Sequence, residues 1–300
     1  MQLNEFIHQN KHLDLFTKKV VEGFLTGLHK SPFHGFSVEF AEHRQYNQGE
    51  DIKHIDWKLL SRTDKLFIKK YEDETNLRCH IIIDQSSSMF FPQKEVSKYQ
   101  YSIIAAACLL QIIKKQKDAF SVSFFSDKID LSTATKSTGS HFIECINLLQ
   151  NKLNKTADNI KTNTGEVLHH IAEKINKRGL VVIFTDLNEY ANNQAALLKG
   201  LQHLYFKKHD IIIFNAIDSS LELALNFDDV PTKFIDSETS EFIKLNPKDV
   251  RASYRESVAA YRNTILEKCR QYKIDIFEAD INKDLENIIA TFIRKRSKYK

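Results

Sequence analysis

The segment IIIDQSSSMFF, residues 81–91, ends a run of β-branched residues at an aspartate and continues with hydroxyl side chains. Asp84, Ser86 and Ser88 alternate along the chain, and in an extended turn alternate side chains point to the same side. Carboxylate and hydroxyl oxygens are hard donors of the kind that magnesium, manganese and calcium prefer. The segment therefore predicts part of a divalent-cation site. Taken alone, it is equally typical of an Asx or serine turn that begins a helix.

Two other segments carry donors that could complete this site. Thr162 lies in KTNTGEVL, in the loop before a predicted helix, and Asp186 ends the strand GLVVIFTD. Because ligands of open α/β sheets bind at the carboxyl ends of the strands, we expect these side chains to meet Asp84. The predicted metal ligands are Asp84, Ser86, Ser88, Thr162 and Asp186.

The charges of these ligands indicate what the ion would do. Two carboxylates balance a divalent cation and hydroxyls add no charge, so a bound ion would accept a further carboxylate from an Asp or Glu of a partner. Magnesium is the favoured ion, with manganese and calcium as alternatives.

Strands and helices alternate from residue 78 onward and would position these ligands. Strands are predicted in RCHIIID, AFSVSFF, GLVVIFTD, HDIIIFNAID and KIDIFEA, with an edge strand in DKIDLSTAT. Helical patterns cover residues 96–117, 140–153, 164–177, 193–206, 248–271 and 283–296. Apolar strands separated by helices form a mostly parallel sheet covered on both faces. The predicted fold class is α/β, with a doubly wound, mostly parallel sheet.

The first part of the chain has a different pattern. A helical stripe at residues 11–28 is followed by loops and short strands. We expect residues 1–75 to form an N-terminal helix-plus-short-strand segment packed on a main domain at 76–300. Within the main domain, residues 219–246 are expected to form a hairpin excursion.

Composition excludes several classes of function. The net charge of the 300 residues is only +4, which gives no sign of nucleic-acid binding, and the basic end RKRSKYK is typical of a solvated tail. The longest nearly apolar run, YSIIAAACLLQII, is too short to insert directly into a membrane. The four cysteines are widely spaced and favour buried free thiols. These features, with a start that lacks a signal-peptide core, predict a cytoplasmic protein.

The motifs resemble a known family. DxSxS after an apolar strand, TN before a helix and TD after a later strand resemble the metal-ion-dependent adhesion site of von Willebrand factor type A domains. The stretch GLHKSPFHGFSVEFAEHRQYNQGEDIKHIDWKLLSRTDKLFIKKYEDETN resembles the signature of the domain-of-unknown-function family fifty-eight, whose members carry such a domain. The resemblance implies the same five metal ligands. It also implies a partnership with a MoxR-type AAA+ ATPase, as an adaptor or co-chaperone.

The signature contains charged and aromatic residues that could form one network. Two interpretations remain open: the network locks the N-terminal segment onto the sheet, or it forms a face for docking a partner. Its predicted members are Glu39, Arg44, Tyr46, Asp51, Asp56, Trp57, Lys58 and Arg62.

The favoured function is a non-enzymatic protein-binding module that uses its ion to capture a partner carboxylate. A metal-dependent phosphoester hydrolase is the first alternative, but Ser86 stands where a haloacid-dehalogenase-like site needs a second aspartate. The sequence also lacks the phosphate-binding GxxxxGK[ST] motif and the GxSxG elbow. A metal-free structural scaffold is the second alternative.

Overall fold

The structure is a computed structural model that describes residues 3–8, 12–29, 43–45, 61–62, 66–69, 77–93, 96–156, 164–175, 177–187, 194–237 and 240–296. The chain divides into two compact units. The larger unit combines Met1–Phe24 with Leu77–Lys300, and the smaller unit is Leu25–Asn76.

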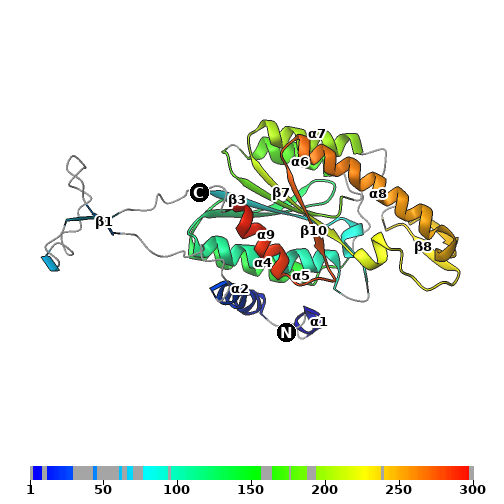
Figure 1. Ribbon diagram of the computed structural model, residues 1–300, viewed down its shortest axis with the longest axis horizontal. Helices are drawn as coiled ribbons and strands as arrows, with labels where there is room; N and C mark the ends of the chain where they lie inside the picture. The colour runs from blue at the N-terminus through cyan, green and yellow to red at the C-terminus, as the bar shows by residue number, and fades with distance from the viewer. Residues whose placement is uncertain are drawn as a thin grey trace. The chain divides into compact units, whose positions relative to one another are not determined.

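The larger unit is built on a six-stranded sheet whose strand order is β10-β7-β6-β3-β4-β5 (Figure 1). Five strands are parallel and β5 is antiparallel at one edge. The strands are β3 (Arg78–Asp84), β4 (Ala119–Phe125), β5 (Ile129–Ser132), β6 (Leu180–Thr185), β7 (Asp210–Ile217) and β10 (Asp275–Asp280). The predicted doubly wound, mostly parallel α/β fold, which is of the von Willebrand factor type A or Rossmann-like kind, is confirmed.

Helices cover both faces of this sheet (Figure 1). One face carries α4 (Lys98–Lys115), α5 (Gly139–Leu153) and α9 (Glu286–Arg296). The other face packs against α6 (Thr164–Lys174), α7 (Gln194–Phe206) and α8 (Pro247–Gln271). The core between that face and these helices contains β-branched strand residues such as Val181, Ile183 and Ile213, which fit a pleated surface buried on both sides.

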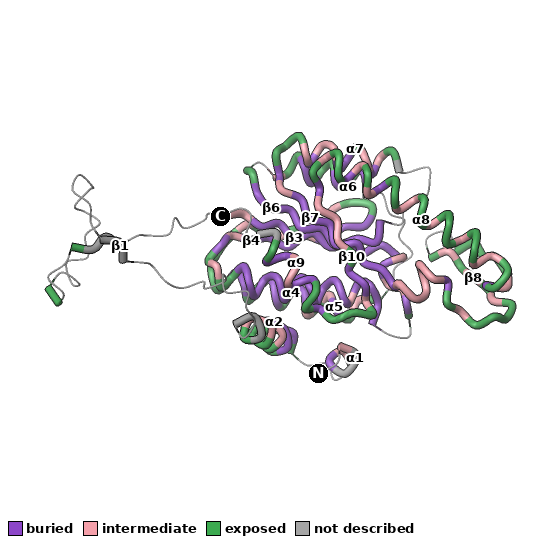
Figure 2. Tube along the Cα trace, viewed as in Figure 1, coloured by how far each residue is buried: buried purple, intermediate pink, exposed green. Residues whose placement is uncertain are grey.

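The helix α4 is buried nearly all round because it is covered on two sides (Figure 2). The sheet lies on one side of it, and α5 and α9, which belong to the same layer, contact its flanks. On the other side, the Gln111 side chain donates to Oδ1 of Asp14 at 2.8 Å, at the start of α2 (Leu13–His29). The first helix, α1 (Leu3–His8), contributes Phe6, whose ring stacks on that of Phe16 at 4.1 Å. A helix sandwiched in this way needs no polar face, which explains its apolar sequence.

Two glycines let α6 and α7 approach each other at backbone distance. A Cβ added at Gly165 would lie 2.2 Å from the carbonyl carbon of Ala196, and one added at Gly200 would lie 2.5 Å from the Gly165 oxygen. Real Cβ atoms do not approach backbone this closely, so a side chain at either position would force the helices apart.

An excursion leaves the sheet after β7. It begins with the π-helix η3 (Ser219–Leu223) and continues as the antiparallel hairpin of β8 (Thr232–Ile235) and β9 (Phe242–Leu245). The hairpin forms a two-stranded sheet separate from the central one. The chain then enters α8, whose first residue is Pro247 after the capping side chain of Asn246.

The smaller unit contains a two-stranded antiparallel sheet of β1 (His43–Gln45) and β2 (Phe67–Lys69). Arg44 lies in β1, opposite Ile68, and Arg62 is exposed. The other members of the predicted network, Glu39, Tyr46, Asp51, Asp56, Trp57 and Lys58, lie outside the described residues. The network and the packing of residues 1–75 on the main domain therefore stay predictions. All four cysteines are free and buried, as predicted.

Candidate functional site

The carboxyl ends of β3 and β6 meet where the order of strands along the sheet reverses. The chain runs from β3 to β4 on one side and later returns to place β6 on the other side of β3. Such a switch point is where α/β sheets bind ligands, because the loops that follow the two strands diverge there. Asp84 is the last residue of β3, and Asp186 directly follows β6. Both side chains are buried.

The Asp84 carboxylate is held by two hydrogen bonds. Its Oδ1 accepts from the backbone N–H of Ser86 at 2.9 Å, and its Oδ2 accepts from the hydroxyl of Thr185 at 2.7 Å. The first bond closes an Asx turn, and the second joins the ends of β3 and β6. The carboxylate is therefore fixed in direction before any ligand arrives.

The serines that follow Asp84 come together as predicted, but by a different geometry. Ser86 is extended, whereas Ser88 lies in a short 3-10 helix, η2 (Ser87–Phe90). The two hydroxyl oxygens are 3.2 Å apart. The expected extended turn is therefore wrong for Ser88, since a 3-10 turn begins at Ser87, directly after the extended Ser86. The Asx turn at Asp84 and the close approach of the two hydroxyls occur together.

A buried lysine lies beside these acids. Lys98, the first residue of α4, has its ammonium 2.9 Å from Oδ2 of Asp186 and 2.5 Å from Oε1 of Glu222. Burial lowers the pKa of Lys98, but attraction to the two carboxylates outweighs burial and leaves the pKa above its ordinary value. The side chain therefore stays charged.

Glu222 reaches this point from η3. Its Oε2 accepts from the backbone N–H of Asp218 at 2.8 Å, and its backbone oxygen accepts from the hydroxyl of Tyr254 at 2.8 Å. Burial raises the pKa of Glu222 and the ammonium of Lys98 opposes that rise. The side chain of Glu222 in this way connects the excursion after β7 to the carboxyl ends of the central strands.

The electrostatics of Asp84 differ from those of its neighbours. Burial, followed by repulsion from Asp186, raises the pKa of Asp84 to about 7, although its hydrogen bonds from Thr185 and Ser86 favour the charged form. Asp186 and Glu222 thus share one ammonium, and Asp84 is close enough to Asp186 to be repelled by it.

Four of the five predicted ligands can be placed. Asp84, Ser86, Ser88 and Asp186 gather at the switch point, and Thr162 lies outside the described residues. Among the described residues, no group of three or more His, Cys, Asp or Glu side chains has the arrangement of a metal site. The predicted site depends on hydroxyls for most of its donors and is of a different type.

Three residues of this site were not predicted from the sequence: Lys98, Thr185 and Glu222. Lys98 had a visible signal, because it is a lone charge between the capping Ser97 and a helix that is apolar nearly all round. Thr185 follows from the strand pairing, which sets it beside the end of β3. Glu222 had no sequence signal, since nothing in the excursion indicates that its helix returns to the sheet.

The fold and this site define a doubly wound α/β protein with buried acids and hydroxyls at the switch point of its sheet. The chain belongs to the family described as "Protein of unknown function DUF58", whose sequence profile matches residues 42–264. The predicted family is thereby confirmed.

Curated relatives are similar over a shorter region. The uncharacterized protein Rv1480 of Mycobacterium tuberculosis (strain ATCC 25618 / H37Rv) is 28% identical over 97 residues, which are 32% of this chain and 31% of that protein. The uncharacterized protein Mb1516 of Mycobacterium bovis matches to the same extent. The match thus spans less than a third of these relatives' own length.

Two solved structures are similar in outline. The conserved hypothetical protein BatB from Bacteroides thetaiotaomicron has a TM-score of 0.45 and 12% identity, over 74% of this chain and 99% of that one. An aerotolerance-related membrane protein from Bacteroides fragilis has a TM-score of 0.40 and 11% identity, over 73% and 99%. In the part of this chain that the structure describes, no helix combines the length and apolarity needed to cross a membrane.

Proposed function

We propose that this protein is a non-enzymatic binding module that holds a divalent cation at the ends of β3 and β6 and presents it to a carboxylate of a protein partner. In this proposal the larger unit is a von Willebrand factor type A-like domain with a metal-ion-dependent adhesion site. The observation that carries it is the convergence of Asp84, Ser86, Ser88 and Asp186 at the switch point.

The donor chemistry fits magnesium. Neighbouring ligands of an octahedral ion with bonds near 2.1 Å lie about 3 Å apart. The Ser86 and Ser88 oxygens are separated by 3.2 Å, which matches this spacing. In the proposal Asp84, Ser86, Ser88, Asp186 and Thr162 hold the ion, with manganese and calcium as alternatives.

The charge of the cluster also supports a divalent cation. Asp84, Asp186 and Glu222 carry three negative charges when ionised, and Lys98 supplies one positive charge. A divalent ion would add two positive charges to this group. Without it, a proton on Asp84 relieves part of the repulsion, in line with the raised pKa of that residue.

The partner would be a MoxR-type AAA+ ATPase or one of its substrates, which this protein would serve as adaptor or co-chaperone. Five protein ligands would leave one position open on an ion that takes about six oxygens, and a partner carboxylate would fill it. The hydrolase alternative lacks support, because Ser86 occupies the place of the second aspartate. The four free cysteines fit a reducing compartment such as the cytoplasm.

Calorimetric titration with magnesium, manganese and calcium chloride tests the metal site directly. We expect one ion per chain in the wild type and none in Asp84→Asn. The exposed Asp228 offers a matched control, so Asp228→Asn should bind as the wild type does. Equal binding by Asp84→Asn and the wild type, or binding by neither, would sink the proposal.

A further inference from the structure

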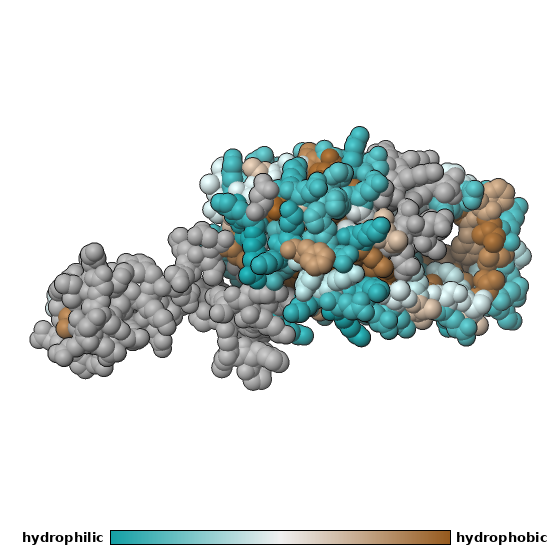
Figure 3. Space-filling model, turned by 90° about the horizontal axis from the view of Figure 1, so that it is seen from above, coloured by the Kyte–Doolittle hydropathy of each residue, from teal (hydrophilic) through white to brown (hydrophobic). Residues whose placement is uncertain are grey.

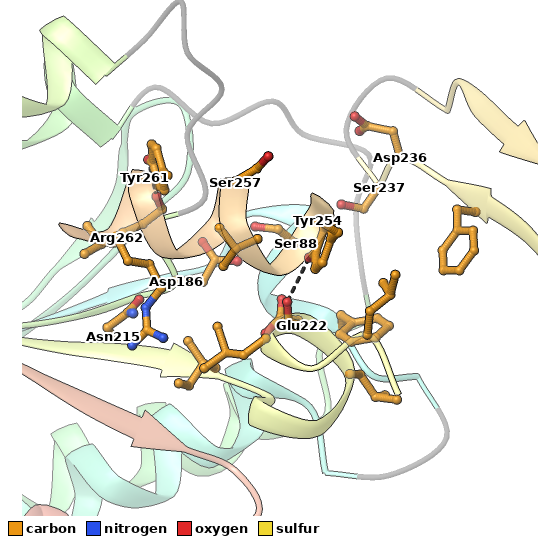
Figure 4. A pocket seen from close by; sticks show the side chains of 18 of the residues that line it. Ser88, Asp186, Asn215, Glu222, Asp236, Ser237, Tyr254, Ser257, Tyr261 and Arg262 are labelled. Carbon is orange, nitrogen blue, oxygen red and sulfur yellow. Dashed lines mark hydrogen bonds between the residues drawn. The ribbon is translucent and has the colours of Figure 1, made fainter. Parts of the chain in front are cut away.

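A cavity of about 1020 Å³ adjoins the proposed metal site (Figure 4). It lies between α8, the β8–β9 hairpin, η3 and the ends of β6, β7 and β10. Ser88 and Asp186, two of the proposed ligands, line it together with Glu222, between Asn215 on one side and Asp236 on the other. Whatever binds an ion held by Ser88 and Asp186 would therefore extend into this cavity.

The hairpin supplies an apolar wall. Phe234, Ile235, Phe242 and Ile243 all line the cavity. The last three of these remain 59%, 60% and 57% exposed. A two-stranded hairpin is marginally stable by itself, and exposed apolar side chains of this size mark interaction surfaces. Figure 3 shows hydrophobic residues gathered around a hollow at the hairpin end of the larger unit.

The exposure of this wall favours a segment of a macromolecule over a small molecule. Pockets for small ligands bury most of the ligand surface within a largely closed cavity. Here Phe242 and Ile235 belong to the lining and to the outer surface at the same time. The site is therefore an open groove, which a peptide can enter and leave at the ends.

A buried acceptor inside the groove indicates a polar contact with the occupant. Asn215 in β7 is the strand-pairing partner of Thr185 in β6. It lines the groove and has only 8% of its surface exposed. Its Oδ1 has no hydrogen-bond partner among the described residues. A buried acceptor without a donor is costly. Oδ1 is itself covered in this structure, so a backbone N–H of a bound peptide would satisfy it once a neighbouring side chain moves aside.

We infer that the groove binds a peptide segment of the protein partner in which at least two large apolar side chains lie next to the captured Asp or Glu. This inference rests on the proposed function for the acidic residue and on the groove for the apolar ones. The apolar side chains would pack on Phe242 and its neighbours, and a backbone N–H would reach Asn215.

The test is a selection of random dodecapeptides displayed on phage against the full chain in magnesium chloride. We expect the enriched peptides to share an Asp or Glu with two large apolar residues beside it. Affinity of the best peptide is then measured by fluorescence anisotropy with the wild type, Phe242→Ser and Phe206→Ser. Phe206, on α7, is 66% exposed and lies outside the groove, so its variant is the matched control.

Loss of one buried aromatic contact should weaken the peptide about tenfold or more in Phe242→Ser and leave Phe206→Ser unchanged. Enriched peptides with an acid but no apolar preference would overturn the inference, as would equal affinity of Phe242→Ser and the wild type. Two further outcomes would overturn the inference. Dimerisation that Phe242→Ser abolishes would assign the groove to a second copy of this chain. Displacement of every peptide by decanoate, tenfold more strongly than by acetate, would assign it to a fatty acid.

The same measurements separate the two proposals. If replacing the acidic residue of the peptide by its amide, or adding EDTA, leaves affinity unchanged while Phe242→Ser weakens it, the metal-site proposal fails and the groove remains. If both acid and magnesium are required but Phe242→Ser has no effect, the groove fails and the metal site remains.

Discussion

The ammonium of Lys98 lies 2.9 Å from Oδ2 of Asp186, and the two side chains are only 1% and 4% exposed. Lys98 begins the helix that follows the Asp84 loop, so this pair joins two of the segments that carry the proposed ligands. Its second partner, Glu222, brings in the excursion after β7. One buried cation thus organises three loops around the end of the sheet.

Replacing Lys98 by methionine should reveal how much the cluster depends on positive charge. Breaking a buried ion pair by removing one partner costs about 3–5 kcal/mol, because a buried carboxylate loses the ammonium that offsets its desolvation. We expect Lys98→Met to lower the free energy of unfolding in urea by that amount in EDTA. Magnesium should restore more stability to Lys98→Met than it adds to the wild type.

The control for this change is Lys115→Met, since Lys115 lies on the same helix with 44% of its side chain exposed. Its effect on stability should be small, with and without magnesium. If magnesium stabilises Lys98→Met and the wild type equally, the ion and the ammonium do not act on the same carboxylates.

The pH dependence of stability should carry the signature of Asp84. Burial and Asp186 raise its pKa from 3.8 to about 7, so in the folded protein the carboxyl keeps its proton while the unfolded chain loses it. The free energy of unfolding in EDTA should therefore fall, by up to about 1.4 kcal/mol per pH unit, as the pH rises from about 4 to 7. Asp84→Asn cannot titrate and should escape this loss.

The measured quantity is the difference in unfolding free energy between Asp84→Asn and the wild type. A difference is needed because burial lowers the pKa of His80 to about 4, which makes the wild type gain stability as the pH rises through part of the same window. The advantage of Asp84→Asn should grow from pH 4 to 7 in EDTA and then level off. A constant difference would contradict the raised pKa.

Asn215 should trade stability against binding. Replacing it by leucine removes a buried acceptor without a partner, so Asn215→Leu should raise the free energy of unfolding by about 1 kcal/mol. The same change should weaken the peptide selected for the groove. Urea unfolding and anisotropy test the two effects, with the exposed Asn226→Leu as control. A less stable variant that binds peptide normally would show that Oδ1 has a structural role.

Association with the expected partner should require the ion. A MoxR-type AAA+ ATPase should co-elute with the wild type in magnesium and separate from it in EDTA or when Asp84→Ala is used. Asp228→Ala should co-elute as the wild type does. If EDTA and Asp84→Ala leave co-elution unchanged, the partner binds another surface, such as the Leu25–Asn76 unit.

The sheet could be predicted because its strands are short apolar runs separated by long helical patterns, and the order of the loops then brought Asp84 and Asp186 together. Ser88 lies beside Ser86 as expected, although the local geometry is a 3-10 turn, and its role as a ligand stays a prediction. The pattern of apolar residues along the chain could not predict side-chain contacts between distant segments. The reach of Lys98 to Glu222 spans 124 residues and depends on where the excursion after β7 folds back. No periodicity encodes such a return.

The close approach of α6 and α7 has a consequence for genetic screens. The helix α6 starts two residues after Thr162, and Gly165 in its first turn lies against the backbone of α7. An alanine at Gly200, on the outside of the sheet and far along the chain from Asp84, would push on that first turn. Loss-of-function alleles at Gly165 and Gly200 should therefore appear in the same phenotypic class as alleles of the proposed metal ligands, although neither glycine has a side chain to offer an ion.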